Sequence, residues 1–264
     1  MKTYGISEMV SLNSKRDILL EEVKLRGYSI IDDYLSEEFC ADLVKRVTEI
    51  YNKQVNDIGL DILKSLNEEN IVRNLVAYDD KFINLVLENG INEVIADILG
   101  PNYQLSLMNA VINTPDKVNH QSSWHRDLPY QEWTISSPLA LNAFYCLTDF
   151  KVKNGATRFI PFSHKMESCP STNFIDNNQI TIEAKQGAII VFDSMLYHSA
   201  GINYSNENRV GMNALFTKPL IKQQINYSRV FANHQDPRVR RIMGVRFDTP
   251  DNELEFREKR IARR

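Results

Sequence analysis

The stretch GAIIVFDSMLYH, residues 187–198, decides the fold that we expect. Its first half is a short apolar run bounded by a glycine and a polar turn, which is typical of a buried strand. Similar runs recur after residue 102, separated by loops rich in Pro, Gly, Asn and Ser, with no helix-length pattern between them. This disfavours a parallel sheet and favours an antiparallel double-sheet jelly roll closed around a central cavity. The predicted strands are 103–113, 139–148, 157–160, 180–183, 188–193 and 210–217.

A helical region precedes these strands. Apolar residues recur there at helical spacing, and Ser, Glu and Gly stand where helices begin and end. We therefore expect residues 1–102 to be mostly helical and to pack on the sheet core, with one short strand among the helices. The predicted elements are a helix from Ser14 to Leu25 ended by Gly27, a strand at 28–31, a helix opened by Ser36, and a helical stretch 80–99 broken near Gly90.

The predicted fold class is mainly β: a double-stranded β-helix, or cupin-like jelly roll, flanked by α-helices. With 264 residues, 43% of them hydrophobic, the chain can bury one large core. We therefore treat residues 1–264 as one domain, with 1–102 as the helical region, 103–219 as the jelly-roll catalytic core and 220–264 as a charged C-terminal extension. From Lys218 onward, 12 Lys and Arg stand against 6 Asp and Glu, which favours a solvated helical tail.

Composition disfavours several classes of function. The formal net charge is -3 and no basic stripe with interleaved aromatic residues occurs, so we expect no nucleic-acid or membrane partner. No stretch approaches the roughly 18 apolar residues of a membrane span, and the first residues lack the apolar run of a signal peptide. The 3 cysteines are far apart and odd in number, which favours reduced thiols. We therefore expect a cytoplasmic protein.

The candidate metal ligands lie in Trp124-His125-Arg126-Asp127 and at His198. In an extended segment, residues i and i+2 project to the same side, so His125 and Asp127 can bind neighbouring positions of one ion. His198 follows Asp127 by 71 positions, as expected for a ligand on a strand across the barrel. Two histidines and one carboxylate form the facial ligand set of mononuclear non-haem iron(II), which leaves open positions for substrate. A lone His-x-Asp arises by chance in roughly one such chain in three, so by itself it is weak evidence for a metal site. The later strand that ends in a histidine strengthens this evidence.

Three stretches occur in a fixed order: WHRDLPY (124–130), NGATRFIPFSH (154–164) and GAIIVFDSMLYH (187–198), the last continuing to Arg209. Together they resemble the phytanoyl-CoA dioxygenase family of iron(II)- and 2-oxoglutarate-dependent oxygenases. The segments GYSII (27–31) and LSEE (35–38) also resemble the usual start of such proteins, so the resemblance spans about 27–219. The chain departs from the family at Phe162, where glycine is frequent, and this position touches no predicted ligand.

The resemblance implies roles for particular residues. Arg209, eleven positions after His198, would bind the distal carboxylate of 2-oxoglutarate, which suits a guanidinium fork. Phe144 and Asn142 share a strand face expected to line the cosubstrate pocket, with a structural role in the core equally open for each. The implied iron ligands, which are the catalytic centre, are His125, Asp127 and His198.

Several neighbouring residues receive no chemical role. Trp124 is expected to pack against the ligand strand and stiffen it, and Arg126 to point away from Asp127. We expect His164 to be structural, Arg158 to be a surface charge and His234 to be unrelated to the chemistry.

The cofactors implied by the resemblance are Fe(II), 2-oxoglutarate and O2. In such enzymes, decarboxylation of 2-oxoglutarate to succinate and CO2 drives hydrogen abstraction from an unactivated carbon. Because family halogenases lack the carboxylate that Asp127 supplies, we expect hydroxylation of a small metabolite or biosynthetic intermediate. Two alternatives stay open: a cupin-like metal-dependent isomerase or hydrolase, and a non-catalytic binding protein on the same fold. The sequence carries no signal for the identity of the substrate or for the oligomeric state.

Overall fold

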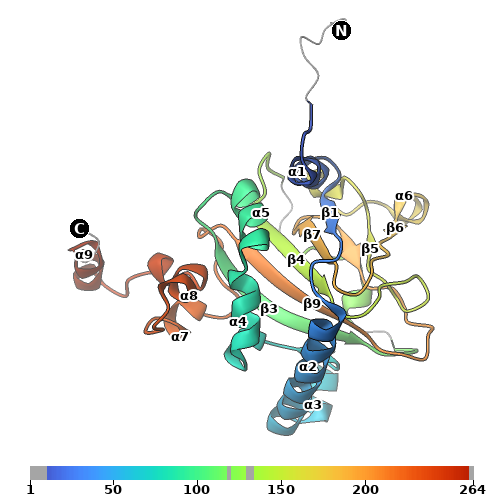
Figure 1. Cartoon of the computed structure of the whole chain (residues 1–264), viewed down its shortest axis with the longest axis horizontal. Helices are drawn as coiled ribbons and strands as arrows, with labels where there is room; N and C mark the ends of the chain where they lie inside the picture. The colour runs from blue at the N-terminus through green and yellow to red at the C-terminus, as the bar shows by residue number, and fades with distance from the viewer. Residues whose placement is uncertain (1–10, 118–119, 129–133, 262–264) are drawn as a thin grey trace, which may run out of the picture.

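The structure, a computed structural model, describes residues 11–117, 120–128 and 134–261. At its centre are two antiparallel sheets, with strand orders β1-β7-β4-β9-β3-β2 and β6-β5-β8 (Figure 1). The predicted mainly β core with flanking helices, a double-stranded β-helix, is confirmed. The strands are β1 (Tyr28–Ile31), β2 (Ile71–Val72), β3 (Gln104–Asn113), β4 (Ala140–Cys146), β5 (Arg158–Phe159), β6 (Ile180–Thr181), β7 (Ile189–Asp193), β8 (His198–Ser199) and β9 (Arg209–Thr217).

The two sheets enclose an aromatic core. Phe144 of β4 and Phe192 of β7 belong to the same buried cluster as Phe159 of the smaller sheet. The ring of Phe159 lies with its centre 5.1 Å from that of Tyr28 and 5.1 Å from that of Phe192. Since side chains alternate along a strand, every second residue of the larger sheet points into this interior, where a ligand can be enclosed.

Helices cover the outer face of the larger sheet (Figure 1), so its strands are buried on both faces. In β4, Ala143 and Tyr145 pack with the helices whereas Phe144 and Cys146 face the interior, which explains the continuous apolar run in the sequence. Within the described ranges, no helix has the length and apolar character needed to span a membrane. The helices are α1 (Lys15–Arg26), α2 (Glu37–Ile58), α3 (Leu60–Ser65), α4 (Asp80–Leu87), α5 (Asn89–Leu99), α6 (Thr172–Asn178), α7 (Tyr227–Val230), α8 (Pro237–Ile242) and α9 (Glu253–Ile261), with short 3-10 turns η1 (Leu75–Ala77), η2 (His120–Ser122), η3 (Ser163–Lys165) and η4 (Val245–Phe247).

Helix ends follow the local capping chemistry. Ser14 and Ser36 accept hydrogen bonds from the backbone N–H three residues on and so cap α1 and α2, and Gly27 ends α1 with φ 95°. The expected break near Gly90 is instead at Glu88. This residue is extended, with ψ 133°, and its carboxylate caps α5 by accepting from the N–H three residues on. A glutamate capping a helix is a weaker sequence signal than a glycine, which explains the shifted boundary.

The C-terminal segment is less solvated than its charge suggests. Tyr227, Val239, Ile242 and Met243 are at most 2% exposed and join the large apolar cluster between the helices and the sheet. Three of these apolar side chains lie in two short helices and Met243 follows α8, so they give no clear period, and the excess of Lys and Arg was the stronger signal in the sequence. The division of the chain into a helical region, a core and an extension stays a prediction.

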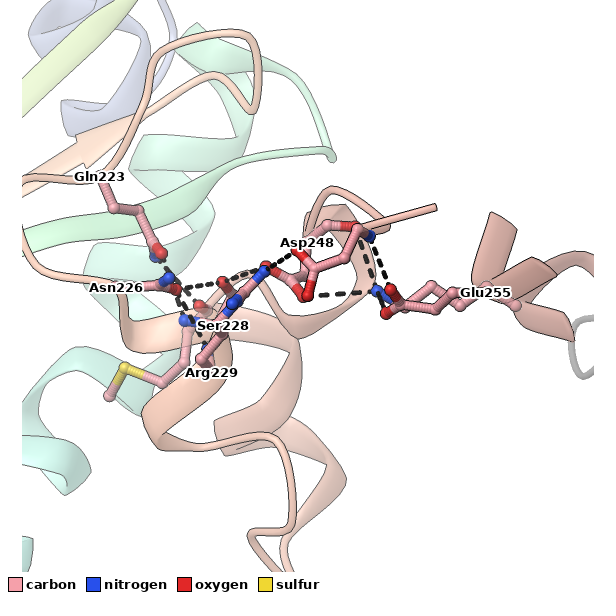
Figure 2. A network of polar contacts seen from close by, with 9 residues as sticks. Gln223, Asn226, Ser228, Arg229, Asp248 and Glu255 are labelled. Atoms are coloured by element: carbon pink, nitrogen blue, oxygen red, sulfur yellow. Dashed lines mark hydrogen bonds and ion pairs between the residues drawn. The ribbon is translucent and has the colours of Figure 1, made fainter. Parts of the chain in front are cut away.

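A polar network joins the last helix to this segment (Figure 2). The guanidinium of Arg229 lies 2.6 Å from Asp251 and 3.7 Å from Asp248. Lys259 of α9 bonds the same Asp248 at 3.3 Å and Glu255 at 2.8 Å. Exposed ion pairs each contribute little, so the network orients α9 more than it stabilises the protein.

Candidate metal centre and cosubstrate pocket

The three predicted ligands meet at the edge of the smaller sheet. The backbone of His125 pairs with that of His198, each N–H donating to the other's carbonyl at 3.0 Å, and the N–H of Asp127 donates to Ser194 O at 3.0 Å. Asp127 Oδ1 lies 3.8 Å from His125 Nε2 and 3.7 Å from His198 Nε2. All three donor atoms lie within 4.8 Å of one another, so they could hold one metal ion.

Both imidazoles present a lone pair to this space. His125 Nδ1 lies 2.7 Å from Ser123 O and His198 Nδ1 lies 2.9 Å from Leu196 O. Because a carbonyl can only accept, each Nδ1 carries the proton and each Nε2 is free to bind a metal. Burial, and then the nearby His125, lower the pKa of His198 to about 4, so it is neutral at pH 7. In the described part of the chain His125 Nε2 is buried without a hydrogen-bond partner, which a bound divalent ion would relieve.

The carboxylate of Asp127 is oriented by two asparagines. Asn142 of β4 and Asn213 of β9 both donate to Asp127 Oδ2, the second at 3.2 Å, and Ser194 donates to Asn142 Oδ1. Oδ1 is thereby left facing the histidines. The sequence placed Asn142 in the lining of the cosubstrate pocket. The structure directs its amide to Asp127, because this residue lies two positions nearer the ligands than Phe144 on the same strand face.

A cavity opens beside the ligand atoms. Phe144 and Arg209 line it together with His125, Asp127 and His198, and their role toward a cosubstrate stays a prediction. Asn213 also lines it and was missed, although it lies four positions after Arg209 on the same inner strand face, so the alternation of β9 was a usable signal. The remaining lining residues carry no mark in the sequence; they are Val111, Gln121, Thr157, Phe192 and Ala200.

Arg209 is a buried cation without an acidic partner among the described residues. It is 1% exposed, its guanidinium carbon lies 4.4 Å above the ring of Phe150, and its Nη1 donates to Thr157 Oγ1 at 3.5 Å. Its Nε has no partner there. Burial lowers the pKa of Arg209 to about 10, so it stays charged at pH 7. Burial also raises the pKa of the nearby Cys146 thiol, which therefore supplies no negative charge. An unpaired buried cation is costly, and the carboxylate of a ligand would compensate it.

The ring of Phe144 occupies space left by a glycine. A Cβ on Gly211 would lie 2.6 Å from the ring of Phe144 and 2.8 Å from that of Phe150. Gly211 stands midway between Arg209 and Asn213, on the same inner strand face. The missing side chain therefore lets an aromatic wall form beside Arg209, and this wall limits the access of water to the guanidinium.

His164 and Trp124 pack against other parts of the chain. His164 is 3% exposed, with Nε2 3.3 Å from Lys24 O, and burial lowers its pKa to about 4. The guanidinium carbon of Arg158 lies 5.2 Å from the centre of the Trp124 ring. The structural roles expected for His164 and Trp124 are consistent with these contacts and stay predictions.

Asp193, which precedes the ligand loop, makes stability depend on pH. It is 4% exposed, and burial raises its pKa from 3.8 to about 6. A carboxyl with a raised folded-state pKa contributes stability below its unfolded pKa, and this contribution is lost as the pH rises through about 6. We expect the free energy of unfolding of Asp193→Asn, relative to the parent, to increase by up to about 3 kcal/mol between pH 4 and pH 7. Denaturant unfolding at several pH values measures this difference, and a difference independent of pH would contradict it.

This double-stranded β-helix brings two histidines, one aspartate and a buried arginine to one cavity, a combination that defines the class of iron(II)- and 2-oxoglutarate-dependent oxygenases. Residues 23–211 match the phytanoyl-CoA dioxygenase (PhyH) family, and the chain belongs to this family. The resemblance seen in the sequence is thereby confirmed. Fe(II), 2-oxoglutarate and O2 are accordingly its cofactors.

Relatives and solved structures agree with this family. The chain is 27% identical over 247 residues to the uncharacterised protein Rv1501 of Mycobacterium tuberculosis, covering 89% of each chain. It is 27% identical to dioxygenase olcK of Penicillium canescens, covering 82% of this chain and 70% of the relative. Epimerase SnoN, solved with Fe3+, alpha ketoglutarate and nogalamycin RO, shares the fold with a TM-score of 0.60 at 16% identity, over 77% of this chain and 84% of SnoN. AviO1 of Streptomyces viridochromogenes shares the fold with a TM-score of 0.61 at 18% identity, over 79% of this chain and 97% of AviO1.

Proposed function

We propose that this chain is a dioxygenase that hydroxylates an unactivated carbon of a small metabolite or biosynthetic intermediate, with release of succinate and CO2. One observation carries the proposal: the cavity that holds the donor atoms of His125, Asp127 and His198 also holds the guanidinium of Arg209, which has no acidic partner among the described residues. A metal site alone requires no such cation, whereas a cosubstrate that binds the metal at one end and carries a carboxylate at the other does.

The protein's own residues supply binding and orientation. His125 Nε2, His198 Nε2 and Asp127 Oδ1 would hold the iron, and Asn142 and Asn213 keep the carboxylate turned toward it. Arg209 would donate to the distal carboxylate of 2-oxoglutarate in a charge-assisted pair. When bound, iron with 2-oxoglutarate and O2 supplies the oxidising power for the C–H bond, and the aromatic walls of the cavity limit competing reactions with water.

Hydroxylation is favoured over halogenation by the presence of Asp127, because a halide would need the coordination position that the carboxylate fills. Reactions other than hydroxylation also occur on this fold, since SnoN is an epimerase. Several relatives are named dioxygenases, and SnoN was solved in complex with nogalamycin RO, which supports a small-molecule substrate. Product analysis by mass spectrometry distinguishes an added oxygen atom from desaturation, epimerisation or ring closure.

The proposal predicts slow consumption of 2-oxoglutarate even without substrate. With Fe(II) and O2 present, we expect succinate and CO2 to form in equal amounts, and both to disappear when Zn(II) replaces iron or when oxygen is removed. The measurement is the labelled carbon dioxide released from 2-oxoglutarate that carries an isotope label at carbon 1. The proposal would be contradicted if the folded, iron-loaded protein formed no succinate, either alone or with a panel of small metabolites. The alternatives, a cupin-like isomerase or hydrolase and a non-catalytic binding protein, would then be favoured, because they do not use 2-oxoglutarate.

A further inference from the structure

Arg126, the residue between the two ligands of the His-x-Asp segment, is buried on the side away from the metal site. Its side chain is 7% exposed. Its Nε donates to Met195 O at 2.8 Å, and its guanidinium carbon lies 4.1 Å from the ring centre of Tyr197. A cation at such a depth is unusual on a segment that is otherwise defined by its metal ligands.

The rest of the guanidinium bonds a second segment. Nη1 donates to Glu167 O at 3.0 Å, and Nη2 donates to Ser163 O at 3.1 Å and to Met166 O. These carbonyls belong to the turn at 163–167, whereas Met195 belongs to the loop 194–198 that ends in the ligand His198. One side chain therefore contacts four backbone carbonyls on two separate segments.

The two segments are themselves joined. Tyr197 N–H donates to Ser163 Oγ at 2.9 Å, and Ile160 N–H donates to Tyr197 O at 3.0 Å. The ligand segment 125–127 is paired with the same loop through His198 and Ser194. Arg126 thus links the ligand segment 125–127 to the turn 163–167 and to the loop 194–198, which contains the third ligand, His198.

We propose that Arg126 is a positioning residue that holds His125 and Asp127 in the orientation required for metal binding, by fixing the backbone between them to the segments 163–167 and 194–198. The inference rests on the proposed function, since it takes these residues to be iron ligands. In an extended segment, residues 125 and 127 point opposite to residue 126, so a single anchor on the far side sets the direction of both.

Arginine is the side chain that this arrangement requires. Its planar fork offers five donors in fixed directions, which can serve carbonyls on both sides and stack on Tyr197 at the same time. Lysine keeps the charge but offers three donors from a single atom. Methionine keeps much of the length and leaves the four carbonyls without this partner, which costs stability as well as orientation.

The test compares Arg126→Met and Arg126→Lys with the parent full-length protein under anaerobic conditions. Residues that orient metal ligands typically change metal affinity by about 10- to 100-fold, so we expect the dissociation constant for Fe(II) to rise by about this factor in Arg126→Met and by less in Arg126→Lys. We also expect the visible spectrum of the Co(II)-loaded protein to change, because the ligand directions change. Circular dichroism and thermal unfolding of the metal-free proteins establish that each variant is folded.

Arg46→Met is the matched control, since Arg46 of α2 is half-buried and its guanidinium donates to Asp79 Oδ2 at 2.8 Å and to Tyr78 O at 3.0 Å, neither of which belongs to the segments 125–127, 163–167 or 194–198. Its Fe(II) affinity and Co(II) spectrum should equal those of the parent. A purely structural Arg126 would lower the unfolding temperature and leave both metal readouts unchanged in the folded variants, which would overturn the inference. If Arg126→Met does not fold, Arg126→Lys decides, and parent-like affinity there overturns it equally. A parent protein that binds no Fe(II) would overturn the proposed function and this inference together.

Discussion

Replacing His198 by alanine is expected to abolish iron(II) binding and the turnover of 2-oxoglutarate. His198 Nε2 is one of three donor atoms that lie within 4.8 Å of one another, and burial keeps its imidazole neutral, so its lone pair is available to the metal; alanine removes this lone pair. Loss of a residue that only supports a ligand costs about 10- to 100-fold in affinity, so loss of the ligand itself should exceed this. Asp127→Ala should behave in the same way.

The measurement is iron affinity together with succinate formation, each on protein shown to be folded. His234→Ala is the matched control, because His234 lies in the C-terminal segment and its Nδ1 accepts only from Asp236 N–H at 3.1 Å. It should keep the iron affinity and turnover of the parent. Full turnover of 2-oxoglutarate in folded His198→Ala or Asp127→Ala would contradict the assignment of these residues as metal ligands.

Replacing Arg209 by methionine is expected to raise the 2-oxoglutarate concentration needed for half-maximal turnover by about 10- to 100-fold. Hydrogen bonds to a charged partner contribute about 1.5–3 kcal/mol, and this pair would form in a buried cavity. Iron affinity without 2-oxoglutarate should not change, because Arg209 contacts Phe150 and Thr157 and none of the ligand atoms. The variant therefore separates binding of the cosubstrate from binding of the metal.

Stability gives this prediction an internal check. Methionine removes a buried cation that has no acidic partner among the described residues, so the metal-free variant should unfold at the same temperature as the parent or higher. A larger requirement for 2-oxoglutarate then cannot be attributed to unfolding. Arg229→Met, a change in the exposed network of the C-terminal segment, should leave the requirement unchanged. An unchanged requirement in Arg209→Met would count against its role and favour the cupin-like alternative.

The fold was predictable because its signals are local and periodic. Short apolar runs bounded by turn residues placed β3, β4, β7 and β9 to within a few residues, and Ser14 and Ser36 marked the starts of α1 and α2. The break at Glu88 and the burial of Met243 were not predicted, since they depend on one side-chain cap and on contacts with distant elements.

The candidate site was predictable where one residue spacing carries the chemistry. The order of His125, Asp127, His198 and Arg209 indicated a metal site and a carboxylate site, and the structure brings these residues to one cavity. The supporting contacts were not predictable, because they join residues far apart in the chain. Asn213 lies 86 positions after the carboxylate that it bonds, and the guanidinium of Arg126 reaches carbonyls 37 to 69 positions away. Such pairs exist only once the strands are in register.

The most direct test of the central claim is an anaerobic titration of the metal-free protein, first with Fe(II) and then with 2-oxoglutarate, followed by visible absorption. We expect a weak metal-to-ligand charge-transfer band in the parent protein, no band in His198→Ala, and a band in Arg209→Met only at much higher 2-oxoglutarate. A folded parent protein that binds iron and shows no band at any 2-oxoglutarate concentration would contradict the account.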